Sequence, residues 1–167
     1  HKLMDLFTDY FRLEDDLDMI YRAINRDKRM ADVIATYPGL RLLRQEPWEC
    51  LVAFICSATS SIQRIGANME AIAGALGHPI TLQGRTRHSF PTASKVARAG
   101  EQFLRDLGLG FRAKYLSYAA IQVAEGSIDL EELRLMPYSK AKARLTELPG
   151  VGPKIADCVL VFSLDKL

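Results

Sequence analysis

A lysine and a cysteine four residues apart are the side chains of this chain best suited to covalent chemistry. Lys154 directly follows the Gly- and Pro-rich stretch Leu148–Pro153, and Cys158 lies one helical turn further on. Residues four apart share one face of an α-helix, so both side chains are expected on the same surface. The positive end of the helix dipole disfavours an ammonium in the first turn, which makes a neutral amine easier to reach. Lys154 is therefore a candidate amine nucleophile for Schiff-base chemistry.

The element that must position this pair is a tight turn between two helices. A helix expected over Ser139–Glu147 ends at Pro149, and two glycines supply the backbone freedom for the reversal. Pro153 then occupies the first position of the next helix, where proline is favoured. Amides near this helix start lack internal acceptors and can receive a phosphate: Gly150, Val151, Gly152 and Lys154. The stretch therefore predicts a helix–hairpin–helix, a motif that grips a DNA backbone without reading its sequence.

Composition supports a helical protein with a real core and sets limits on its partners. The chain has 167 residues, of which 49% are hydrophobic, and a net charge of +2. That charge is too small to indicate nucleic acid by itself. Residues 83–115, however, contain seven Lys and Arg against two acidic residues, whereas the N-terminal stretch is acidic. This uneven distribution supports a nucleic-acid partner, although a run of charge is also typical of a solvated face.

Cysteine number and hydropathy exclude several classes of protein. Cys50, Cys56 and Cys158 do not form a disulfide framework and are too few for a four-thiolate iron–sulfur site. No apolar run approaches the ~20 residues of a membrane span, and no secretory signal is visible. We expect an intracellular protein, in the nucleus, nucleoid or cytoplasm depending on the host, with no membrane partner.

Apolar residues recur at helical spacing along most of the chain and predict an all-α fold. Residues 7–12 are expected to be a short connector, and residues 80–90 a loop with some extended structure. Residues 92–98 and 100–107 are expected to form two separate short helices. We expect three parts: residues 1–45, a connector and first helices packing on the second lobe; residues 46–137, a central helical domain; and residues 138–167, the helix–hairpin–helix motif, incomplete at its C-terminal end.

The segment Leu148–Asp165 (LPGVGPKIADCVLVFSLD) resembles the signature of the helix–hairpin–helix DNA glycosylases, and within them the 8-oxoguanine DNA glycosylases. Three further blocks match in the order of the family and at roughly its spacing: Gly39–Cys50, Phe54–Ser57 and Leu107–Tyr115. Hairpins of this type occur in many DNA-binding proteins, so the lysine and the other blocks carry the specificity. The resemblance implies two helical lobes, with the hairpin motif at the cleft between them.

This resemblance implies a bifunctional DNA glycosylase and AP lyase that repairs 8-oxoguanine opposite cytosine. Such enzymes flip the damaged nucleotide out of the duplex. Lys154 would attack the sugar C1′ and hold the sugar as an imine, from which the strand is nicked. Cys158 would recognise the oxidised base. The expected partner is damaged double-stranded DNA, the expected state is a monomer, and the chemistry requires no cofactor.

The resemblance also assigns roles in handling the duplex. Phe111 stands where the family has a wedging aromatic residue, commonly tyrosine, and Arg112 and Arg64 match arginines that contact the estranged cytosine. Thr59 opens the stretch Thr59–Ser61, which replaces an asparagine run that fills the gap in the stack. A core aromatic residue at Phe111 and a solvated arginine at Arg64 remain the alternative interpretations.

A cation is implied at the hairpin rather than at histidines. By resemblance, three backbone carbonyls could hold a structural cation that bridges to DNA phosphate: those of Thr146, Leu148 and Val151. His78 and His88 have no second ligand at metal-binding spacing and are expected to be loop residues.

The resemblance finally implies a central fragment of a longer enzyme. The N-terminal β domain of the family and the C-terminal segment with its catalytic aspartate are not matched by these 167 residues. Two other functions therefore stay open. One is a non-enzymatic helix–hairpin–helix module that only grips DNA, and the other is a glycosylase for another damaged base.

Overall fold

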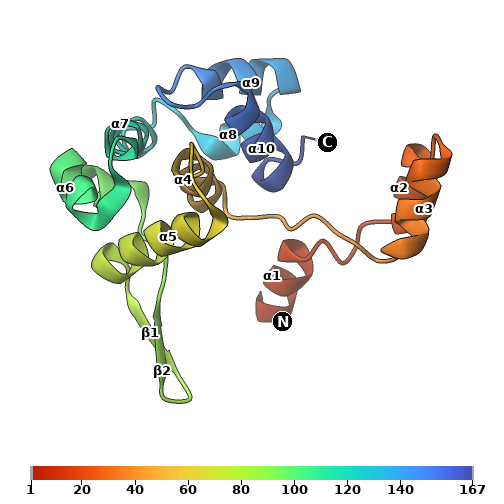
Figure 1. Ribbon diagram of the computed structural model, residues 1–167, viewed down its shortest axis with the longest axis horizontal. Coiled ribbons are helices and arrows are strands. Elements are labelled where there is room, and N and C mark those ends of the chain that lie inside the picture. Colours follow the sequence, from red (N-terminus) through yellow and green to blue (C-terminus); the bar gives the residue numbers. More distant parts are fainter. Residues whose placement is uncertain (1, 167) are drawn as a thin grey trace. The chain divides into compact units, whose positions relative to one another are not determined.

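The computed structural model describes residues 2–166, and the chain divides into two compact units at the boundary between residues 45 and 46. Both units consist mainly of helices, and the second unit also contains one short β-hairpin (Figure 1). The all-α fold class expected from the periodicity is confirmed. The further division expected at residue 137 stays a prediction. Among the described residues, no helix is long and apolar enough to cross a membrane.

The first unit contains three short helices: α1 (Lys2–Tyr10), α2 (Leu17–Ile24) and α3 (Lys28–Thr36). The side chains of Asp16 and Asp27 cap α2 and α3, each accepting a hydrogen bond from the amide three residues on. None of the residues in these helices is buried. The connector expected at residues 7–12 is wrong, because α1 continues to Tyr10 on a stripe of apolar residues at helical spacing.

The second unit is built around α4 (Pro47–Cys56) and α10 (Pro153–Ser163), which pack against each other (Figure 1). Glu46 caps α4 by accepting a hydrogen bond from the Glu49 amide at 2.6 Å, and Pro47 holds the first helical position. Leu51 on α4 and Leu160 on α10 are both fully buried in the main core.

Around this pair lie α5 (Ile62–Leu76), α6 (Ala93–Leu104), α7 (Arg112–Ala124), α8 (Leu130–Leu135) and α9 (Tyr138–Thr146). Within α6, Gly100 has a non-helical backbone (φ 78°, ψ 173°) and divides the element into two helical stretches, which agrees with the break expected between residues 98 and 100. A single π-helical turn, η1 (Arg105–Leu109), follows α6. Gly108 (φ 88°) adopts a left-handed conformation and reverses the chain from η1 toward α7.

Residues expected to be a loop with some extended structure form an antiparallel β-hairpin, β1 (Pro79–Leu82) and β2 (Arg85–His88). Its two-residue turn places Gln83 (φ 50°) and Gly84 (φ 74°) in the left-handed region, as tight hairpin turns require. All eight strand residues are exposed, and the hairpin projects from the helices (Figure 1). With no buried face, the strands have little apolar alternation, which is why the sequence pattern indicated extended structure without giving the two strands.

Candidate active site

The predicted helix–hairpin–helix is formed by α9, a turn over residues 147–152, and α10. The turn is closed by hydrogen bonds from the Leu148 amide to the Leu145 carbonyl at 3.2 Å and from the Val151 amide to the Leu148 carbonyl at 3.0 Å. Gly150 has a φ of 85°, which only glycine adopts without strain. Whether this motif lies at a cleft between two lobes stays a prediction.

Two of the amides assigned to phosphate binding lie at the start of α10. Gly152 is its N-cap residue and has no side chain to satisfy the first turn, and Lys154 lies within that turn. Such amides have no acceptor inside a helix and can bind an anion. The Val151 amide, by contrast, already donates within the turn. The structure therefore favours Gly152 and Lys154 over Val151 as phosphate donors.

The side chains of this motif, all within the described part of the chain, do not form a metal site by themselves. Among residues 2–166, no group of three or more His, Cys, Asp or Glu side chains could hold an ion. The carbonyl of Leu148 accepts the Val151 amide and keeps one lone pair. Cation binding by the carbonyls of Thr146, Leu148 and Val151 stays a prediction.

One face of α10 presents an amine, a thiol and an aromatic ring in order. Lys154 is exposed, Cys158 is half-buried, and Phe162 follows at the next helical turn. The Phe162 ring stacks on Phe54 of α4, with centroids 5.8 Å apart and an interplanar angle of 20°. This aromatic pair was missed from the sequence, although the spacing of Phe162 from Cys158 was a usable signal.

The other two cysteines are inert by comparison. Burial raises the pKa of the Cys50 thiol to about 12, against a lowering hydrogen bond with Ser163. Burial likewise raises the pKa of Cys56 to about 11. Both are fully buried core residues, as expected for cysteines on an apolar helix. Among the three cysteines, all within residues 2–166, only Cys158 is partly accessible.

Phe111 is an exposed aromatic residue at the start of α7, and its role as a wedge stays a prediction. It is 50% exposed and stands directly before α7. Its ring contacts two neighbours: the Arg112 guanidinium carbon lies 4.7 Å from the ring centroid, and the Tyr115 ring meets it edge-on at 6.3 Å. Arg112 and Tyr115 cover part of the ring, and half of the residue stays exposed to solvent. The alternative of a core aromatic residue is not what the structure shows.

Arg112 is buried and bonded to backbone carbonyls of another segment. It is only 4% exposed, and its guanidinium donates to the carbonyls of Ala58 at 2.8 Å and Thr59 at 3.1 Å. It therefore fastens the loop between α4 and α5 to the start of α7. These bonds occupy the Nε and Nη2 donors of the guanidinium, and the contact with an estranged cytosine stays a prediction. The 54-residue separation between Arg112 and Ala58 gave no sequence signal for this contact.

The loop that Arg112 holds carries Thr59 and leads into α5. Thr59 has a φ of 48°, a left-handed conformation that is unfavourable for a β-branched residue and easier for asparagine. Ser61 then caps α5 by accepting a hydrogen bond from the Arg64 amide at 3.3 Å. Arg64 is exposed in the first turn of α5. Where the resemblance implies asparagine, this chain therefore holds threonine under backbone strain.

A polar cluster joins the two helices of the motif next to Lys154. Asp157 on α10 accepts hydrogen bonds from the Tyr138 hydroxyl at 2.7 Å and from the Lys142 ammonium at 2.8 Å, both on α9. The Lys142 hydrogen bond, with that of Tyr138, lowers the pKa of Asp157, and the Asp157 carboxylate raises the pKa of Lys142. Asp157 thus serves to hold α9 on α10.

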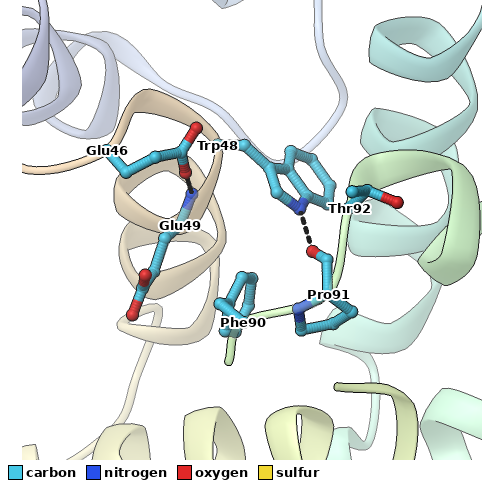
Figure 2. A pocket seen from close by; sticks show the side chains of 6 residues that line it. All are labelled: Glu46, Trp48, Glu49, Phe90, Pro91 and Thr92. Atoms are coloured by element: carbon cyan, nitrogen blue, oxygen red, sulfur yellow. Dashed lines mark hydrogen bonds between the residues drawn. The ribbon is translucent and has the colours of Figure 1, made fainter. Parts of the chain in front are cut away.

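A separate hollow of about 220 Å³ lies beside Trp48 (Figure 2). It is lined by Glu46, Trp48, Glu49, Phe90, Pro91 and Thr92. The Trp48 indole donates to the Pro91 carbonyl at 3.0 Å, and burial raises the pKa of Glu49. Neither Lys154 nor Cys158 lines this hollow. Through its bond to Pro91, Trp48 packs the start of α4 against the segment before α6.

Comparisons with known proteins agree with this arrangement. A sequence model of the 8-oxoguanine DNA glycosylase N-terminal domain matches residues 1–51. The chain is 37% identical to an N-glycosylase/DNA lyase of Arabidopsis thaliana over 84% of its own length and 40% of the relative. It is also 37% identical to an N-glycosylase/DNA lyase of Saccharomyces cerevisiae, over 93% of its own length and 44% of the relative. The chain thus spans less than half of each of these curated relatives.

A solved structure gives the same result for the fold. The 8-oxoguanine glycosylase/lyase of Clostridium acetobutylicum superimposes with a TM-score of 0.92 and 30% identity, covering 99% of this chain and 57% of that chain. The similarity extends over both units of the chain, each of which contains residues matched by these relatives. The chain therefore belongs to the 8-oxoguanine DNA glycosylase family of the helix–hairpin–helix superfamily.

Proposed function

We propose that this chain carries the nucleophile and the DNA grip of a bifunctional 8-oxoguanine DNA glycosylase and AP lyase that acts in base excision repair. The observation that carries the proposal is Lys154, exposed in the first turn of α10 directly beyond the Gly-rich turn and on one face with Cys158. The two curated relatives are named N-glycosylase/DNA lyase. The Clostridium enzyme was solved with double-stranded DNA containing cytosine opposite 8-oxoguanine.

The motif would hold one strand by its phosphates. The amides of Gly152 and Lys154 would bind a phosphate at the start of α10, where the helix dipole also favours an anion. Backbone carbonyls of the same turn could add a bridging cation that is not needed for the chemistry. Phe111 would enter the stack where the damaged nucleotide leaves, and Arg64 and the Thr59 loop would face the base left behind.

The reaction would proceed on the flipped nucleotide. The neutral Lys154 amine attacks C1′, the bond from C1′ to the base breaks, and the proton lost by the amine balances the charge on the departing base. The C1′–amine adduct becomes an imine as the sugar ring opens. Elimination of the 3′ phosphate from this imine then nicks the strand, which joins glycosylase and lyase activity in one residue.

Recognition of the base would fall to the face of α10 beyond Lys154. A planar purine entering beside Cys158 would meet the half-buried stack of Phe54 and Phe162. Aromatic walls of this kind hold a flipped base by stacking. We further infer that the protein acts as a monomer in the compartment that holds the DNA of its host.

The experiment is borohydride trapping of the chain on a duplex containing 8-oxoguanine opposite cytosine. The chain should give a covalent adduct on this duplex and not on an undamaged duplex. Lys154→Gln should abolish the adduct while duplex binding stays within about twofold. Lys140→Gln, which removes the same charge from an exposed position of α9, is the matched control and should leave the adduct unchanged.

Retained trapping by Lys154→Gln would overturn the assignment of the nucleophile. Absence of any adduct from the unaltered chain, with duplex binding intact, would favour a module that only grips DNA.

A further inference from the structure

Tyr115 lies where the wedge and the phosphate-binding turn come together. It sits on α7, one helical turn after Phe111, and its side chain is half-buried against the main core. It has no role in the proposed reaction. Its contacts nevertheless join the wedge and the phosphate-binding turn, the two parts of the molecule that would engage DNA. The inference drawn from these contacts rests on the proposed function.

The first contact is with the hairpin. A Cβ atom at Gly150 would lie 2.5 Å from Cγ, 2.7 Å from Cδ2 and 2.9 Å from Cβ of Tyr115. No side chain fits in that space, so the Tyr115 ring packs directly on the backbone of the turn. Glycine is thus required at position 150 for two reasons: the φ is positive, and the neighbouring Tyr115 ring leaves no room for a Cβ atom.

The second contact is with the wedge. The rings of Phe111 and Tyr115 meet edge-to-face, at a centroid distance of 6.3 Å and an angle of 79°. Aromatic pairs in this geometry are attractive beyond the area they bury. Phe111 itself is half exposed and has the Arg112 guanidinium 4.7 Å from its ring centroid. Arg112 in turn donates to the carbonyls of Ala58 and Thr59.

The three segments that would touch DNA are therefore connected through one continuous series of contacts. The loop of Thr59 is held by Arg112, Arg112 covers Phe111, Phe111 meets Tyr115, and Tyr115 packs on Gly150. The wedge and the phosphate grip must act on one strand at a fixed separation. A shift of about 1 Å between such elements can lower a reaction rate by about a hundredfold.

We propose that Tyr115 is a positioning residue whose ring sets the place of Phe111 relative to the hairpin, so that insertion into the stack and phosphate binding occur in one register. The contacts use the ring and not the hydroxyl. The ring is therefore the part of the side chain that matters.

The test measures binding of the 167-residue chain to two duplexes, one undamaged and one with a tetrahydrofuran abasic-site analogue opposite cytosine. Insertion of a wedge adds most to binding affinity where the base stack is already broken. The ratio of the affinities for the abasic and the undamaged duplex therefore measures whether Phe111 is positioned to insert. Tyr115→Phe keeps the ring and should keep this ratio within about twofold. Tyr115→Met fills the space without a ring and should lower the ratio by about three- to tenfold.

Non-additivity identifies the route of the effect. Phe111→Ala, at an exposed position, should lower the ratio by a similar factor, and adding Tyr115→Met to it should lower the ratio no further. The thermal unfolding midpoint should change little in Tyr115→Phe and Phe111→Ala.

Three results would overturn the inference. One is a loss of the ratio in Tyr115→Phe. Another is an equal loss of affinity for both duplexes in Tyr115→Met, which would show a role in folding alone. The third is a double variant whose effects add. An unaltered chain with no preference for the abasic duplex would instead contradict the proposed function itself.

Discussion

The two units of the chain use the same local signals for helix formation and differ in what lies beneath the helices. In residues 2–45, α2 and α3 have well-formed aspartate caps, yet none of the residues in the three helices is buried. In residues 46–166, Leu51, Leu109 and Leu160 are fully excluded from solvent. Caps and propensity are thus sufficient to specify a helix, whereas stability comes from burial of apolar surface.

The candidate site follows the same division. Lys154, Cys158, Phe111, Arg112 and Thr59 all belong to the second unit, where the core fixes the elements that carry them. A nucleophile held by packed helices is placed more accurately than one on a segment without a core. The difference between the units can be tested directly.

The largest expected difference is in amide hydrogen exchange. Helices without buried side chains open at low free energy, while core helices open only with global unfolding. Amides of α2 and α3 should therefore exchange at least about a hundredfold faster than those of α4 and α10, corrected for intrinsic rates. Equal protection of α3 and α10, measured by mass spectrometry on the native chain, would show that the first unit is as well packed as the second.

The difference between the two units should also appear in how much the free energy of unfolding falls when one side chain is truncated. Leu160→Ala removes a side chain with 0% exposure and should lower the free energy of unfolding by about 2–5 kcal/mol. Val33→Ala on α3, where the side chain is 47% exposed, should change it by less than about 0.5 kcal/mol. Urea denaturation followed by circular dichroism measures the free energy of unfolding of both variants. Comparable decreases in the two variants would contradict the difference between the two units.

Thiol chemistry distinguishes the site from the core within the second unit. Burial raises the pKa of Cys50 to about 12 and of Cys56 to about 11, so both stay protonated and shielded at pH 8. Iodoacetamide should therefore add one group to the native chain, at the partly accessible Cys158, and three groups after unfolding. Peptide mapping reads out the site. Modification of Cys50 or Cys56 in the native chain would show that the core opens readily.

The smallest effect concerns the ion pair between α9 and α10. The lowered pKa of Asp157 means that its contribution to stability is complete above about pH 3.8 and is lost as pH falls through the folded value. The raised pKa of Lys142 means that its contribution is complete below about pH 10.5 and is lost as pH rises above it.

Asp157→Asn should therefore flatten the pH dependence of stability slightly at both ends of the range, with little change in fold at neutral pH. Glu70→Gln, at an exposed carboxylate of α5, is the control and should leave the pH dependence unchanged. An identical pH profile for Asp157→Asn and the unaltered chain would show that this exposed pair contributes nothing measurable.

The sequence was informative where the physical cause is local. The turn over residues 147–152 followed from two prolines and two glycines at fixed positions, and the helices followed from apolar spacing. Lys154 and Cys158 could be placed on one face from their separation alone. The family assignment drawn from these residues is confirmed by the comparisons.

The contacts that organise the site were not predictable because they join distant residues. Arg112 meets Ala58 across 54 positions, and the packing of Tyr115 on Gly150 leaves no periodic pattern. Phe162 follows Cys158 at helical spacing, but nothing local in the sequence indicates that its ring stacks on Phe54. The exposed β-hairpin was predicted only as some extended structure in a loop, since strands without a buried face show little alternation.

The most direct test of the account is to locate the covalent bond. A duplex with a natural abasic site presents the sugar aldehyde without requiring removal of a base, so any amine held at C1′ can form an imine with it. After borohydride reduction and digestion, peptide mass spectrometry should find the sugar adduct on Lys154 alone. An adduct on Lys140, Lys142 or another amine, or one spread over several lysines, would contradict the claim that α10 delivers the nucleophile.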